Sequence, residues 1–260
     1  MFDLAHMMTL LPAFSLVLVR ISGIMLSAPV YSSAAVPARL KAGLAVLISL
    51  VVFPLVRPAM TDIPASLLGV AVAAAGELLI GLAIGLAVNL IFTGIELGAQ
   101  LVAQQMGLGL AHLIDPTLEE ETGVLEQFYI LMATALLLVF NGHQLIIRAV
   151  LDSFSTLPPM TLTLQPEMLH VLRGLLAASF VLALKMSVPA MVIMMLVSLM
   201  MGFLGRTVPQ INILVVGFPL RIGVGLLALI GSFGAAMVVF SQGYSQTVDA
   251  VGQMIRHLGG

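Results

Sequence analysis

The chain has 260 residues, of which 60% are hydrophobic and 8% are charged, and its mean hydropathy is +1.17. Soluble domains carry about 25% charged residues, so this composition excludes an ordinary water-soluble enzyme and indicates a membrane or membrane-complex protein. A net charge of −2 without any cluster of Lys and Arg argues against nucleic-acid binding, and the lack of cysteine excludes disulfides, iron–sulfur clusters and thiol catalysis.

Six apolar windows approach the length of about 20 residues that a membrane-crossing helix needs. In chain order they are 9–30, 41–56, 65–95, 127–147, 174–201 and 211–241. Asp3 rather than a basic cluster precedes the first window, which favours a retained helix over a signal peptide. Pro189 and Pro219 lie inside the last two windows and predict kinked or broken helices there. The sequence therefore predicts an all-α, hydrophobic multi-helix subunit.

The third window is too long for one simple crossing and contains two glycine pairs at helical spacing. Gly81 and Gly85 form one pair, and Gly94 and Gly98 form the other. Pairs of small residues four apart let two helix backbones approach closely where lipid gives no hydrophobic drive for association. Each pair is expected to pack against a neighbouring helix.

Four charged residues lie inside the apolar windows, where an ion costs about 3 kcal/mol on insertion scales. They are Arg20, Glu77, Lys185 and Arg221. Each should therefore be paired or face a cavity. One interpretation is an ion or proton pathway, and the favoured one is a set of ion pairs between helices or subunits. Three cations and one anion imply that some partners come from other subunits.

The segment from Gln104 to Pro116 is typical of neither a helix nor an exposed loop. Gly107 and Gly109 break helical order and Asp115-Pro116 marks a turn, yet the residues between them are apolar. The backbone of such a connection cannot face lipid, so it is either a re-entrant or plugging loop or a linker packed on its own subunit. The residues alone leave these alternatives equal. The candidate plug residues are Met106, Gly107, Leu108, Gly109, Leu110, His112, Leu113, Ile114, Asp115 and Pro116.

Signatures of catalysis and cofactor binding do not occur in the sequence. There is no H-E-x-x-H, no G-x-S-x-G, no Walker loop and no dinucleotide fingerprint. The five histidines are too widely scattered to indicate a metal site. We therefore expect no enzyme activity, no cofactor and no metal.

Several motifs occur together in one order along the chain. They are Arg20 with Ala28-Pro29, Pro37 with Lys41-Ala42-Gly43-Leu44, Gln105-Met106-Gly107 through Asp115-Pro116, Phe140-Asn141-Gly142-His143, Asp152-Ser153-Phe154 before Leu157-Pro158, Arg206 with Pro209-Gln210, and Gly217-Phe218-Pro219-Leu220. In this combination the chain resembles the FliR family of flagellar biosynthesis proteins, which is related to the T subunit of virulence type III secretion export gates. The resemblance extends over nearly the whole chain.

The resemblance implies a single FliR-type domain over residues 1–260, in one copy within a helical hetero-oligomeric export gate. Residues 1–173 would form a FliP-like part with a plug loop at 106–121, and residues 174–241 a FliQ-like helical hairpin. Residues 242–260 would form a C-terminal tail, which matches the family least.

The implied function is to help form and close the conduit for unfolded flagellar proteins across the bacterial inner membrane, in the flagellar basal body and partly on its periplasmic side. The implied partners are FliP-like and FliQ-like gate subunits, FlhB- and FlhA-like export components, the unfolded substrates and membrane lipid. Gly107 and Gly109 would let the loop swing aside, and Leu108, Leu110, Leu113 and Ile114 would fill the closed lumen. The alternatives are an ion-coupled secondary transporter that uses Glu77, Lys185 and Arg221, and a purely structural assembly scaffold.

Overall fold

The computed structural model describes residues 4–29, 31–32, 36–56, 66–108, 123–157, 166–208, 210 and 212–258. Within these ranges the chain forms seven helices and no strand, which confirms the predicted all-α class. The helices are α1 (Leu4–Ser27), α2 (Ala38–Val56), α3 (Leu67–Met106), α5 (Val124–Val139), α6 (Gly142–Thr156), α7 (Pro166–Thr207) and α8 (Ile213–Leu258). Five of them are long and apolar enough to cross a membrane, and α5 with α6 adds a sixth span if the pair is taken as one.

The chain divides into two compact units. The first unit contains Met1–Leu90, Leu137–Leu175 and Gln246–Gly260, and the second contains Ile91–Leu136 and Leu176–Ser245. The first unit therefore holds α1, α2 and α6, and the second holds most of α5. The long helices α3, α7 and α8 contribute residues to both.

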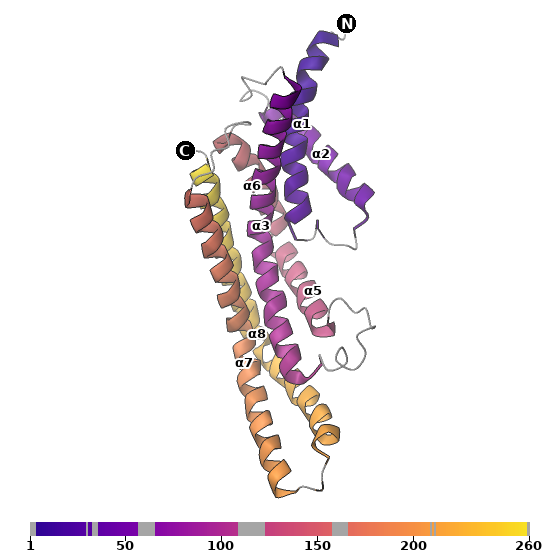
Figure 1. Cartoon of the computed structure of the whole chain (residues 1–260), viewed down its shortest axis with the longest axis vertical. Helices are drawn as coiled ribbons and strands as arrows, with labels where there is room; N and C mark the ends of the chain where they lie inside the picture. Colours follow the sequence, from indigo (N-terminus) through magenta and orange to yellow (C-terminus); the bar gives the residue numbers. More distant parts are fainter. Residues whose placement is uncertain are drawn as a thin grey trace. The chain divides into compact units, whose positions relative to one another are not determined.

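In the first unit, α1 and α2 each bury one stripe of small and aliphatic residues. The stripe of α1 includes Leu16, Val17, Ile21 and Ile24, at the spacing of one helix face, and the buried Ala28 follows directly after the helix. The stripe of α2 consists of Ala45, Ser49, Val52 and Val56, and α2 packs against α1 and α6 (Figure 1). Most of the remaining surface of α2 is apolar and exposed. This unit therefore has a core of its own but leaves an apolar helix largely uncovered.

The glycine pair Gly81–Gly85 brings α3 against α1. A Cβ on Gly81 would clash with the carbonyl oxygen of Arg20 and lie 3.1 Å from the Cα of Gly23. A Cβ on Gly85 would lie 2.8 Å from the carbonyl oxygen of Ile24. The two backbones are therefore in direct contact, which confirms the prediction for this pair.

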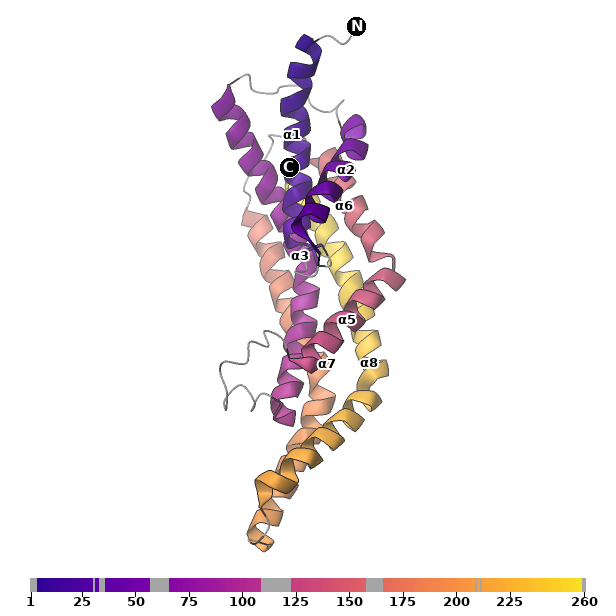
Figure 2. The same cartoon turned by 90° about the vertical axis from the view of Figure 1, so that its right-hand side faces the viewer.

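In the second unit, the pair Gly94–Gly98 brings α3 against α7. A Cβ on Gly94 would lie 2.6 Å from the carbonyl oxygen of Ser179, and one on Gly98 would lie 3.0 Å from that of Ala183. The same helix therefore uses two glycine pairs for two different neighbours, as the spacing predicts. After α7 the chain reverses, so that α7 and α8 form a long helical hairpin (Figure 1; Figure 2).

The apolar windows differ in whether each forms one continuous helix, and the expectation of one segment is wrong for the fourth. The third window is one continuous helix of 40 residues. Pro189 and Pro219 lie inside α7 and α8 without ending either helix, so neither helix is broken there, and a kink at each proline stays a prediction. Within a membrane-type bundle, local adjustment and neighbouring groups can satisfy the backbone groups that proline frees. The fourth window is not one helix, because it breaks at Asn141. Asn141 has φ 56° and ψ 31°, a left-handed conformation that asparagine tolerates better than most residues.

Candidate functional site

The predicted plug segment begins at the end of α3, where the chain forms a defined helix stop. Gly107, with φ 80°, follows the last helical residue, Met106. The N–H of Gly107 donates to the carbonyl of Gln104, and the N–H of Leu108 donates to that of Ala103, both at 3.1 Å. These two bonds form a Schellman motif, in which a left-handed glycine satisfies the last carbonyls of a helix. Gly107 therefore terminates α3 and fixes the direction in which the chain leaves it.

Met106 lies at the centre of a hydrophobic cluster in the second unit. The Met106 cluster consists of Val102, Ala103, Met106, Leu125, Ala190, Met194 and Ala228. Met106 and Met194 have no exposed surface, and Leu108 packs against the cluster from outside. Leu108 thus contacts its own subunit on one side, and its lumen-filling role stays a prediction. The sequence pattern does not distinguish a leucine that packs behind a helix end from one that projects into a lumen.

The other candidate plug residues fall outside the described part of the chain. They are Gly109, Leu110, His112, Leu113, Ile114, Asp115 and Pro116. The description resumes at Gly123, whose N–H donates to the Glu126 carboxylate at 3.3 Å in the first turn of α5. Their function as a plug stays a prediction.

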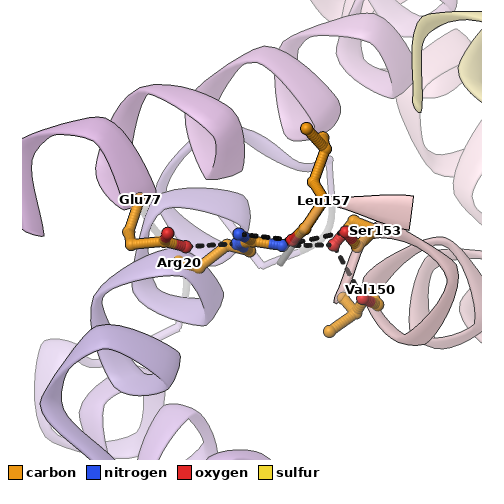
Figure 3. Close-up of polar contacts among 5 residues, drawn as sticks. All are labelled: Arg20, Glu77, Val150, Ser153 and Leu157. Atoms are coloured by element: carbon orange, nitrogen blue, oxygen red, sulfur yellow. Dashed lines mark hydrogen bonds and ion pairs between the residues drawn. The ribbon is translucent and has the colours of Figure 1, made fainter. Parts of the chain in front are cut away.

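In the first unit, the buried side chain of Arg20 lies where three helices meet (Figure 3). We call Arg20 and the groups that it contacts the Arg20 network. From α1, its Nε donates to the Glu77 carboxylate of α3 at 2.5 Å. Its terminal nitrogens donate to the carbonyls of Ser153 and Leu157, at 3.0 and 3.1 Å. The guanidinium also lies 4.1 Å from the centre of the Phe154 ring, in cation–π geometry. One side chain therefore joins α1 and α3 to the C-terminal end of α6.

Charge and burial explain why the network takes this form. Arg20 is 0% and Glu77 1% exposed, and two ions removed from water must satisfy each other closely to offset their lost hydration. The carbonyls of Ser153 and Leu157 lie at the negative end of α6, where a cation is favoured. Arginine stays protonated in proteins. The pair is therefore suited to holding the three helices together and not to relaying protons.

The two remaining predicted charges, Lys185 and Arg221, have a different environment. Lys185 on α7 is exposed and Arg221 on α8 is half-buried. Among the described residues neither has an ion-pair partner, and the ion pair found there joins Arg20 to Glu77. Both cations thus lie inside apolar helices without an anionic partner among the described residues.

The motif residues of the middle and C-terminal parts lie at or near the ends of helices. Phe140 and Asn141 form the break between α5 and α6, Gly142 and His143 begin α6, and the Nδ1 atom of His143 is buried without a hydrogen-bond partner among the described residues. Arg206 lies in the last turn of α7. Gln210 follows α7, and Pro209 is outside the described residues. The first two turns of α8 contain Gly217, Phe218 and Pro219.

Two structural roles were missed by the sequence reasoning. Ser153 and Leu157 belong to a recognised motif, but their use as backbone acceptors for Arg20 has no signal in residue type, because every residue carries a carbonyl. Gly225, which contacts Met106, is one of several glycines in its window. Within the described residues no group of three or more potential metal ligands occurs.

Comparison with known proteins shows similarity along nearly the whole chain. The family described as bacterial export proteins, family 1, matches residues 11–247. Three similar proteins are each named flagellar biosynthetic protein FliR. The protein of Pectobacterium carotovorum subsp. carotovorum is 34% identical over 214 residues, which cover 81% of this chain and 80% of the relative. The protein of Escherichia coli K12 is 30% identical, with 91% and 92% covered, and that of Bacillus subtilis 168 is 28% identical, with 96% and 97% covered.

Proposed function

This chain belongs to the bacterial export proteins of family 1 and is a membrane component of the flagellar type III export apparatus, and we propose that it helps to form and close the export conduit itself. In this proposal the conduit carries unfolded flagellar proteins across the inner membrane at the flagellar basal body. Part of the gate lies on the periplasmic side of that membrane.

The observation that carries the proposal is the length of apolar helix that the chain leaves uncovered. At 1.5 Å per residue, the 46 residues of α8 extend about 69 Å. The hydrocarbon core of a bilayer is about 30 Å thick. Only 17% of the apolar window Val215–Gln253 is buried within the chain. A flat bilayer covers about half of such a helix, so the other half requires a shell of protein.

This requirement supports an assembly of several hydrophobic subunits. The partners that we propose are FliP-like and FliQ-like proteins, with FlhB- and FlhA-like components nearby. Residues 1–173 supply the FliP-like part and residues 174–241 the FliQ-like hairpin. The hairpin of α7 and α8 supports this division, since both helices are long and expose apolar side chains along their length.

Two cations that have no ion-pair partner within the described part of the chain support the same assembly. Lys185 and Arg221 lie in apolar helices, where an isolated ion is costly. We propose that carboxylates on partner subunits neutralise them once the gate is assembled. The alternative of a secondary transporter is weakened, because its central acidic residue, Glu77, is already bound to Arg20.

Closure of the conduit is assigned to the segment after α3. Its apolar residues, Leu110, Leu113 and Ile114, exclude water and ions from the lumen by packing, as hydrophobic constrictions do. The stop at Gly107 supports this assignment, because it ends a long apolar helix abruptly in the middle of the chain. Gly107 and Leu108 themselves belong to the helix end, so the part that closes the lumen starts at residue 109.

Native mass spectrometry tests the assembly that this function requires. The chain is co-expressed with its neighbouring operon products and purified in mild detergent. We expect one copy of this chain with several copies of two smaller hydrophobic proteins. The chain expressed alone serves as the control for non-specific association. A monomer or homodimer in the co-expressed sample would contradict the proposed gate.

A further inference from the structure

One face of α7 is buried within the second unit, and the opposite face is exposed. The buried face packs on α3, where Gly94 and Gly98 lie against the backbone of Ser179 and Ala183. The exposed face carries a line of residues spaced alternately by four and three positions, which we call the outer seam. The outer seam consists of Val181, Lys185, Val188, Val192, Met195 and Leu199, all of them exposed.

The spacing of the outer seam is that of a helix that packs against another helix. Apolar residues that alternate by three and four positions form the contact line between the helices of a coiled coil. The buried face of α7 has the same alternation, in Ser179, Ala183, Met186 and Ala190. The helix therefore has one contact line that its own chain fills and a second that nothing in the described part of the chain covers.

Lys185 is the charged residue of the outer seam, and it has no ion-pair partner among the described residues. It lies at the middle of the 42 residues of α7, so its side chain cannot extend to either end of the helix to keep the ammonium in water. Because Pro189 has no N–H, the carbonyl of Lys185 lacks the donor that a regular α-helix supplies four residues later. Lys185 therefore carries a cation without an anion and a carbonyl without its regular donor.

We propose that the outer seam binds one apolar helix of a partner subunit, with a carboxylate of that helix against the ammonium of Lys185. Lipid tails supply neither an anion nor a hydrogen-bond donor, whereas a carboxylate neutralises the charge within the apolar contact. A single lysine in such a contact line also fixes the register of the two helices. The inference rests on the proposed function for the existence of partner subunits, and it adds the face, the register and the chemistry of one of them.

A carbodiimide cross-link tests the contact directly. Dicyclohexylcarbodiimide is apolar and activates buried carboxylates, and an amine in contact with the activated carboxylate forms an amide and releases the urea. The chain has two lysines, Lys41 and Lys185, so mass spectrometry of the peptides distinguishes their products. In the co-expressed complex we expect Lys185 to be linked to an Asp or Glu in an apolar segment of a partner subunit. Lys185→Arg is the control, because it keeps the charge but its guanidinium forms no amide.

Two results would overturn the inference. In an assembled complex, Lys185 that forms no cross-link, or one to its own chain, would show that no partner carboxylate lies at the outer seam. Bound anionic lipid that is lost in Lys185→Met, with assembly unchanged, would show that lipid covers the seam instead. Failure of the wild-type chain to assemble at all is a different result, which would contradict the proposed function itself.

A charge reversal tests the register. Lys185→Glu should not change the free energy of unfolding of the chain alone, since residue 185 is exposed there. It should lower the yield of the full complex about tenfold or more, because like charges then face each other across the interface. Replacing the cross-linked partner carboxylate by lysine should restore the yield, and a yield that stays low would contradict the proposed pairing. Arg173→Glu, at an exposed cation of the same helix outside the outer seam, is the matched control and should assemble like the wild type.

Discussion

Replacing Arg20 by alanine is expected to lower the free energy of unfolding of the purified chain by about 3–5 kcal/mol, the usual cost of breaking a buried ion pair. The change leaves the Glu77 carboxylate buried without its cation. It also removes the donors to the carbonyls of Ser153 and Leu157 at the end of α6. Unfolding in mixed detergent micelles, followed by circular dichroism, measures the loss.

Two further variants identify the cause of that loss. Arg20→Lys keeps the charge but not the planar set of donors, so it should recover only part of the stability. Arg20→Met with Glu77→Met removes both ions and should be more stable than Arg20→Ala, because no uncompensated charge remains. If the double variant is as unstable as the single one, the ion pair is not what holds the network.

Replacing Gly81 by alanine is the second change with a large expected effect. The added methyl group meets the Arg20 carbonyl and the Cα of Gly23, so α1 and α3 must separate. Overpacking of this kind costs about 1–3 kcal/mol. The loss occurs although alanine favours a helix over glycine by about 1 kcal/mol. The same micelle unfolding measurement applies.

Gly43 of α2, in the same unit, supplies a control substitution whose expected effect on stability has the opposite sign. A Cβ on Gly43 meets nothing within 4 Å, so Gly43→Ala should raise stability by up to about 1 kcal/mol through helix propensity alone. Destabilisation by both substitutions to the same extent would mean that the close approach at Gly81 does not determine the packing of α1 on α3.

The parts of the fold that follow from local pattern were predictable from the sequence. Apolar length indicates the helices, and the two glycine pairs of α3 indicate its close contacts because small residues four apart have few other uses in lipid. The break at Asn141 was missed although Gly142 follows it, because an Asn-Gly pair marks a turn and the apolar length of the window outweighed that signal. Pro189 and Pro219 do not show from sequence whether they bend or break a helix, because the cost of a helical proline depends on which groups surround it.

The candidate site was predictable only where the residue type itself carries a signal. Arg20 and Glu77 stand out because ions are rare in apolar windows, and the structure joins them. Their backbone acceptors have no residue signature. Gly107 is indicated by its type, but its use as a helix cap requires the two hydrogen bonds at the end of α3. The pairing of Met106 with Gly225 depends on a contact between residues far apart in the sequence.

Ion conductance of the assembled gate, reconstituted in lipid bilayers, tests most directly whether this chain closes the conduit. The variant lacks residues 109–113 and keeps Met106, Gly107 and Leu108, so that the cap of α3 and the Met106 cluster stay intact. Native mass spectrometry first verifies that it assembles like the wild-type chain. We predict that the wild-type gate is closed and that the variant conducts ions. An intact assembly with unchanged conductance would contradict the account and would favour a chain that only scaffolds its partners.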